Sequence, residues 1–333
     1  MSSSLARVAV VQQPPAVLDL AEGVRRAVDC IEAAAADGAQ LVVFPETWLT
    51  GYPAWVFGLA GWDDEEARKW YGRLLAQSPV MDGPELDPIR AAARRHRLLV
   101  ALGLNERAGA AAGSLYNTLL YVGPDGATLG AHRKLVPTHT ERIVWAPAPD
   151  ASGLQVHATM IGRVGGLVCW EHWQPLARQA LHAQDEQIHL ALWPDMTEMH
   201  GLAVRTYAFE GRCFVVSAAQ YLSADDVPEE VRQAYRRGVG ADTPATGIWF
   251  HGGSGVAGPD GSWLAEPLYD TPGILHAELD VALTASFKHD LDVVGHSSRP
   301  DLFTLTVDRR PRAPVSWQTP ETLPAPQLPD HAG

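Results

Sequence analysis

Apolar runs alternate with amphipathic stretches along the first half of the chain. Residues 6–12 and 40–46 each contain a short run of valine and other apolar side chains, which is typical of buried strands. Between these runs, apolar residues recur at helical spacing from Leu20 to Ala35, which predicts a helix that ends near Gly38. Continuous apolar strands joined by helices indicate an α/β sheet covered by helices.

The same alternation continues to the end of the second half. It predicts further helices at 62–78, 84–97, 174–184 and 198–212, strands at 98–106, 160–171, 188–194 and 213–220, and hairpins at 114–135 and 249–266. Each hairpin has Pro-Asp-Gly as its turn. Because each half of the chain passes through strand–helix units and then such a hairpin, we expect two similar sheets packed together in one domain.

Two segments do not follow this alternation. Residues 223–246 are polar and interrupted by glycine and proline, which predicts a loop or a short exposed helix. Residues 309–333 form a tail that holds five prolines from Ala313 onward, so we expect it to be extended or to form an interface.

Composition and charge exclude several classes of partner. The chain has 333 residues, of which 46% are hydrophobic and 20% charged, as in soluble globular proteins. A net charge of −13 argues against nucleic acid and anionic membrane surfaces as partners. No apolar stretch approaches the roughly 20 residues of a membrane span, and the N-terminus lacks the apolar core of a signal peptide. With three cysteines and no CxxC pair, the chain suits a reducing compartment, and we expect it to be cytoplasmic.

Cys169 is the first candidate for chemistry. A free cysteine is most often a buried, inert core residue. This one, however, ends a predicted strand and precedes the polar and aromatic stretch WEHWQ. Ligands of open α/β sheets bind beyond the carboxyl ends of strands, and the amide of Trp170 would there face a developing anion.

A nucleophilic thiol requires a nearby base or cation, and two residues could supply them. Glu46 follows an apolar strand and Pro45, where burial would raise its pKa and make it a usable base near neutrality. Lys134 ends a hairpin strand beside Leu135. The alternatives are a structural acid for Glu46 and an exposed surface lysine for Lys134.

Three segments in this order, FPETWLTGYP, HRKLVPTHTER and GGLVCWEH, resemble the nitrilase superfamily of carbon–nitrogen hydrolases. The resemblance extends through WPDMTEMHGLAVRTYAFEGRCFV and GHSSRPDLF and covers residues 5–308, while CWEHWQPL and PTHTER are most similar to the true nitrilase branch. It implies one domain over 5–308 with a four-layer α-β-β-α sandwich. It also implies a catalytic triad of Glu46, Lys134 and Cys169, with a second glutamate at Glu141.

The implied reaction hydrolyses an organic nitrile with two waters to a carboxylic acid and ammonia. It passes through a covalent thioimidate and a thioester on Cys169, with Lys134 beside the nitrile nitrogen and Glu46 as base. Glu141 would orient Lys134 or bind the leaving nitrogen, or else be an ordinary loop acid. The alternatives are an aliphatic amidase, a carbamoylase or a cyanide-hydrolysing enzyme of the same superfamily, and a catalytically silent binding protein on that fold.

Aromatic residues crowd the same segments. Those expected to bind substrate are Tyr52, Trp55, Trp170, His172 and Trp193, although such side chains serve equally well in a core or a subunit interface. Neither a metal nor a cofactor is expected, because the histidines near these motifs match no zinc spacing. The expected partners are a small nitrile and further copies of the chain, since the resemblance implies a homodimer that is often extended into spirals.

Overall fold

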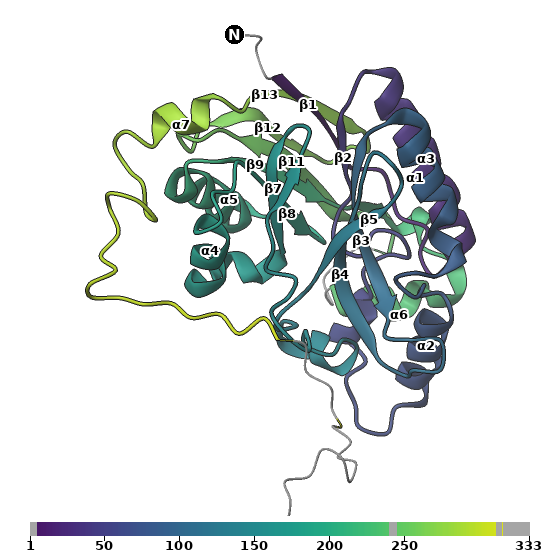
Figure 1. Ribbon diagram of the computed structural model, residues 1–333. Coiled ribbons are helices and arrows are strands. Elements are labelled where there is room, and N and C mark those ends of the chain that lie inside the picture. Colours follow the sequence, from purple (N-terminus) through teal and green to yellow (C-terminus); the bar gives the residue numbers. More distant parts are fainter. Residues whose placement is uncertain (1–4, 240–244, 311–314, 316–333) are drawn as a thin grey trace, which may run out of the picture.

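The computed structural model describes residues 5–239, 245–310 and 315. Two β-sheets lie face to face, and helices cover the outer face of each (Figure 1). In Figure 1, α1 and α3 flank one side of the molecule, and α4 and α5 flank the other. The expected four-layer α-β-β-α sandwich is therefore confirmed.

The first sheet has the strand order β13-β1-β2-β3-β4-β5. Its strands are β1 (Leu5–Val11), β2 (Leu41–Val43), β3 (Leu99–Arg107), β4 (Leu115–Val122), β5 (Thr128–Arg133) and β13 (Ile274–Asp280). Strands β1, β2 and β3 are parallel, and β4, β5 and β13 pair antiparallel with their neighbours. The helices of this half are α1 (Leu20–Ala36), α2 (Glu65–Ala76) and α3 (Asp87–His96).

The second sheet has the order β10-β11-β9-β8-β7-β6, with β12 paired to β11. Its strands are β6 (His157–Thr159), β7 (Gly162–Val168), β8 (Ile188–Trp193), β9 (Phe214–Ala219), β10 (Tyr221–Ser223), β11 (Ile248–Ala257) and β12 (Trp263–Tyr269). Helices α4 (Pro175–His182) and α5 (Glu198–Gly211) cover its outer face, α6 (Glu229–Val239) precedes β11, and α7 (Leu283–Phe287) follows β13.

The two halves of the chain repeat one topology. Three parallel strands, β1-β2-β3 or β7-β8-β9, are followed by an antiparallel hairpin, β4-β5 or β11-β12. Each hairpin turns at Pro-Asp-Gly, where Gly126 (φ 80°) and Gly261 (φ 77°) adopt the left-handed conformation that favours glycine. The echo expected from the sequence is thus present in the structure.

The inner faces of both sheets form one apolar core. Val8, Val43 and Leu119 from the first sheet belong to the same buried cluster as Val168 and Leu190 from the second. The outer face of the first sheet packs separately against α1 and α3. Strands buried on both faces explain why the sequence shows continuous apolar runs rather than strict alternation.

The segment 223–246 differs from expectation. It contains α6, whose Val231, Ala234 and Tyr235 are buried in a cluster with residues of the short 3-10 helix η1 (Ala54–Phe57). The prediction of an exposed loop or exposed helix was wrong here, because these apolar residues share one helical face within a polar segment. Residues 240–244 lie outside the described part of the chain.

The proline-rich tail is described only at three of its positions, 309, 310 and 315. Arg309 donates a hydrogen bond from Nη1 to Oε1 of Gln155 at 3.1 Å. An extended or interface-forming tail over 309–333 stays a prediction. In the described residues, no helix combines the length and apolar character needed to cross a membrane.

Candidate active site

The turn after β2 carries Glu46 into the space between the sheets. Thr47 has a φ of 49°, so the chain bends sharply directly after Glu46, whose side chain is completely buried. A Cβ atom on Gly103 of β3 would lie 1.9 Å from the carbonyl oxygen of Pro45. Glycine at position 103 therefore permits the close approach that places the Glu46 turn against the sheet.

Lys134 directly follows β5 and is also buried, with 1% of its surface exposed. Its backbone amide continues the ladder by donating to the carbonyl of Asn117 at 2.8 Å. Its Nζ donates to Oε1 of Glu46 at 3.0 Å and to Oε2 of Glu141 at 2.8 Å. The alternative of an exposed surface lysine is excluded, because this ammonium group bridges two buried carboxylates.

Glu141 lies on the 3-10 helix η3 (His139–Ile143). Besides the contact from Lys134, it accepts hydrogen bonds from the hydroxyl of Tyr52 at 2.5 Å and from the amide of Thr138 at 2.6 Å. Both carboxylate oxygens therefore act as acceptors, and Glu141 is the second carboxylate that holds Lys134 in place.

Cys169 begins the 3-10 turn η4 (Cys169–Trp173) where β7 ends. Its φ of 55° is a left-handed conformation, which costs an L-residue about 1–2 kcal/mol. Its sulfur, one carboxylate oxygen of Glu46 and one of Glu141 lie within 4.8 Å of one another. The structure thus brings together, in one buried space, the four residues that the sequence analysis selected as catalytic: Glu46, Lys134, Glu141 and Cys169.

Burial controls the ionisation of this cluster. It raises the pKa of Glu46 to about 7, against the opposing charge of Lys134 and with a further contribution from Glu141. Burial and the charge of Glu46 raise the pKa of the Cys169 thiol well above its usual value, while Lys134 and the amide of Trp170 oppose them. Burial lowers the pKa of Lys134, but the charges of Cys169, Glu46 and Glu141 outweigh it and leave that pKa well above its usual value. The resting site therefore holds a neutral thiol beside an ammonium group.

Two amide side chains that the sequence analysis missed hold Glu46. Asn117 of β4 donates from Nδ2 to Oε1 of Glu46 at 2.6 Å, and Gln220 donates to the backbone carbonyl of Glu46. The other oxygen, Oε2, has no hydrogen-bond partner among the described residues. A polar Asn within the apolar strand LYNTLLYV was the available signal for the first of these contacts.

Glu171 was missed as well, although it lies within the CWEH motif. Its Oε1 accepts from the amide of Leu135 at 2.7 Å, and its Oε2 accepts from the amide of Val168 at 2.7 Å. His132 contacts Oε2 through Nε2 at 2.9 Å. One buried carboxylate therefore ties the segment that carries Lys134 to the strand end that carries Cys169.

The five residues expected to bind substrate lie in different surroundings. Tyr52 contacts Glu141, and His172 lies 2.7 Å from the Cys169 carbonyl through Nδ1. The Trp193 ring packs on His172 with centroids 4.6 Å apart. The remaining two are Trp170, whose surface is 54% exposed, and Trp55, which is buried in the cluster of η1 and α6. Their roles toward substrate stay predictions.

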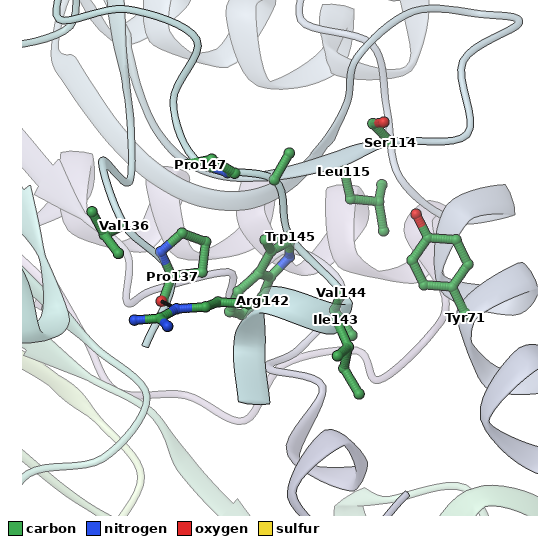
Figure 2. A pocket seen from close by; sticks show the side chains of 11 residues that line it. Tyr71, Ser114, Leu115, Val136, Pro137, Arg142, Ile143, Val144, Trp145 and Pro147 are labelled. Carbon is green, nitrogen blue, oxygen red and sulfur yellow. Dashed lines mark hydrogen bonds between the residues drawn. The ribbon is translucent and has the colours of Figure 1, made fainter. Parts of the chain in front are cut away.

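A cavity of about 380 Å³ is lined in part by Arg142 and Ile143 of η3 (Figure 2). Its lining includes Val136, Arg142, Val144 and Trp145, which Figure 2 shows around the hollow. The Trp145 ring centroid lies 5.9 Å from Nζ of Lys134. Trp145 therefore lines the cavity and also lies near the buried cluster.

The thiol of Cys169 and the carboxylates of Glu46 and Glu141 are also the kinds of ligand that a metal ion uses. In this cluster the ammonium group of Lys134 already provides a cation, because it donates hydrogen bonds to both carboxylates. The arrangement is suited to nucleophilic attack by sulfur, with a carboxylate to take the thiol proton and an ammonium group to stabilise the resulting anion.

Comparison with known proteins gives relatives over nearly the whole chain. Nitrilase 3 of Arabidopsis thaliana is 36% identical over 322 residues, which cover 95% of this chain and 91% of that protein. A nitrilase of Paraburkholderia phymatum is 39% identical over 86% of this chain and 81% of its own length. An aliphatic nitrilase of Rhodococcus rhodochrous is 36% identical over 93% of this chain and 84% of its own length.

Solved structures share the fold at lower sequence identity. The NitFhit protein of C. elegans superposes with a TM-score of 0.68 at 22% identity, over 93% of this chain and 68% of that chain. A carbon–nitrogen hydrolase of Helicobacter pylori G27 superposes with a TM-score of 0.67 at 19% identity, over 89% of this chain and 96% of that chain. The model of the carbon–nitrogen hydrolase family matches residues 7–289. With its fold, its buried cluster and these relatives, the chain belongs to the carbon–nitrogen hydrolase family.

Proposed function

We propose that the protein is a nitrilase that converts an organic nitrile and two waters into a carboxylic acid and ammonia. The observation that carries the proposal is the buried cluster in which Lys134 bridges Glu46 and Glu141 within reach of the Cys169 thiol. The relatives named nitrilase, from plants and bacteria, support a nitrile as the substrate.

The first half of the reaction forms a covalent thioimidate. As the sulfur of Cys169 adds to the nitrile carbon, its proton moves to the unpartnered oxygen Oε2 of Glu46. One carbon–nitrogen π bond breaks, and the nitrogen takes a proton from Lys134. Lys134 then regains a proton from Glu46, so that both groups return to their starting charges; Nζ lies 3.0 Å from Oε1, the other oxygen of that carboxylate.

The second half releases ammonia and then the acid. Glu46 takes a proton from a water that adds to the thioimidate carbon, and the nitrogen accepts protons through Lys134 and leaves as ammonia. A second water adds to the resulting thioester, which expels the sulfur as the Cys169 thiol and frees the carboxylic acid. Glu141 serves throughout to hold Lys134, from which the leaving nitrogen receives its protons.

Product analysis on matched substrates tests the proposal. The purified protein is incubated with aliphatic, aromatic and arylacetic nitriles, with cyanide, and with the amide that corresponds to each nitrile. We expect carboxylic acid and ammonia from at least one organic nitrile. A protein that hydrolyses the amides but leaves every nitrile unchanged would overturn the assignment in favour of an amidase or carbamoylase.

The activity should rise with pH through about 7, because Glu46 acts as a base only when ionised and burial raises its pKa to about 7. Below that pH, kcat/KM should fall about tenfold per pH unit as the carboxylate is protonated. Replacing Glu46 with glutamine should lower kcat by about 10²- to 10⁴-fold and abolish this acidic limb. Initial rates of ammonia release across the pH range measure both effects.

A matched control for this variant is Glu106→Gln. Glu106 is a buried glutamate of β3 that pairs with Arg133, the residue directly before Lys134, which is the cation that pairs with Glu46. The activity of the Glu106→Gln enzyme should still fall below a pH of about 7, whether or not the substitution changes stability. A Glu46→Gln enzyme with the wild-type pH profile would show that another group is the base.

Assembly and location complete the proposal. Apolar side chains of Leu176 on α4 and of Met199, Leu202 and Phe209 on α5 are exposed on the outer face of the second sheet. They support a homo-oligomer, a dimer or larger assembly, for which sedimentation velocity gives the size. We also propose a cytoplasmic location, which suits the three free and buried cysteines.

A further inference from the structure

A buried chain of polar side chains leads away from Cys169 on the side of α5. Nδ1 of His172 lies 2.7 Å from the Cys169 carbonyl oxygen, and Nε2 of His172 lies 3.0 Å from Nε2 of His189. Nδ1 of His189 lies 2.9 Å from Oε1 of Glu186, and the hydroxyl of Tyr207 donates to Oε2 of Glu186 at 2.6 Å. All five residues are buried, and the reaction described above uses only the first of them.

The contacts of this chain fix where each proton lies. A carbonyl oxygen only accepts hydrogen bonds, so Nδ1 of His172 must carry the proton that it donates to Cys169. Burial lowers the pKa of His172 and of His189 well below the usual value, so both rings are neutral. Nε2 of His172 is then an acceptor, and Nε2 of His189 must be the donor to it.

The same reasoning gives the protonation state of Glu186. Since the neutral ring of His189 carries its proton on Nε2, its Nδ1 has only a lone pair to offer. Glu186 must then donate to it, which a carboxyl group does only when protonated. Burial raises the pKa of Glu186 to about 7, while Tyr207 and His182 oppose that rise.

We propose that Glu186 is a positioning residue, a neutral acid within a one-way chain of hydrogen bonds that runs from the Tyr207 hydroxyl to the carbonyl of Cys169. The chain fastens the left-handed Cys169 turn to β8 through His189 and to α5 through Tyr207. It holds the thiol at the angle from which it attacks. The inference rests on the proposed function for its catalytic consequence, although the geometry itself does not depend on the substrate.

Glutamine and leucine at position 186 separate a positioning role from a merely structural one. Glutamine can donate through its amide to His189 and accept from Tyr207, so Glu186→Gln should keep most of the wild-type kcat. Glu186→Leu fills a similar volume but offers His189 no donor. We expect it to lower kcat by about 10²-fold with little change in KM, because a small displacement of a reacting group costs that much.

A second pair of variants covers the case in which Glu186→Leu does not fold. Tyr207→Phe removes the hydroxyl that donates to Glu186 and should lower kcat more mildly. Tyr121→Phe is its control, because the Tyr121 hydroxyl is buried in the same core and has no hydrogen-bond partner among the described residues. That control should leave kcat unchanged.

The rate at which iodoacetamide alkylates Cys169 reports on the position of its thiol and requires no nitrile. Peptide mass spectrometry measures this rate. Alkylation should slow in Glu186→Leu and stay near wild type in Glu186→Gln. If the wild-type protein turns over no nitrile, the proposed function is wrong. The difference in alkylation rate between Glu186→Leu and Glu186→Gln can still be measured. Equal losses of kcat and alkylation rate in the glutamine and leucine variants, or none in either, would overturn the positioning role of Glu186.

Discussion

Replacing Cys169 with alanine should lower ammonia release from nitriles by about 10⁶-fold, the loss typical of removing the nucleophile from a covalent mechanism. Every bond-forming step of the proposed reaction uses this sulfur, and no other thiol can replace it. Cys30 and Cys213 are buried elsewhere, in the α1 cluster and directly before β9. Mass spectrometry of the intact protein during turnover should show a substrate adduct on wild type and none on the variant.

Cys30→Ala is the matched control, because it removes another buried thiol, on the outer side of the first sheet. It should retain wild-type turnover and form the same adduct. An adduct that persists in Cys169→Ala, or turnover that survives in it, would place the nucleophile elsewhere and end the proposed mechanism.

Replacing Lys134 with methionine should damage both catalysis and folding. Without the ammonium group beside the developing negative charge, kcat should fall by about 10²- to 10³-fold, the effect of removing one donor of this kind. Folding loses the cation that separates two buried carboxylates, and breaking such a buried pair costs about 3–5 kcal/mol. Turnover and denaturant unfolding of the same preparation measure the two effects.

Two further variants isolate the cause. Lys69→Met removes an exposed lysine that lies over the Trp70 ring, and it should leave both turnover and unfolding nearly unchanged. The double variant Lys134→Met/Glu46→Gln should recover part of the lost stability and none of the activity, since it removes one of the two uncompensated carboxylates. A stable and active Lys134→Met enzyme would refute both roles of the ammonium group.

Much of the fold was visible in the sequence because its signals are local. Valine-rich runs mark strands that are buried on both faces, and the two Pro-Asp-Gly turns mark the hairpins without reference to the rest of the chain. The burial of α6 was not visible, because its Val231, Ala234 and Tyr235 stand among charged residues that raise the average polarity of the segment.

Only the site residues that lie within recognisable motifs could be predicted from the sequence. Glu46, Lys134 and Cys169 stand in recognisable segments, but their meeting depends on contacts between residues far apart in the chain, such as the Glu46–Lys134 pair, whose members are 88 positions apart. Asn117 and Glu186 look like ordinary polar residues in the sequence. Their roles follow from which atoms face them in the folded chain, and no local pattern encodes that information.

The residues of the buried cluster are divided between the two halves that repeat one topology. Glu46 and Lys134 belong to the first half, after β2 and β5, whereas Cys169 belongs to the second, after β7. Neither half alone therefore contains both the proposed nucleophile and the groups proposed to activate it. During synthesis, the proposed base and cation leave the ribosome before the sulfur. On this proposal, activity requires the finished molecule with both sheets docked.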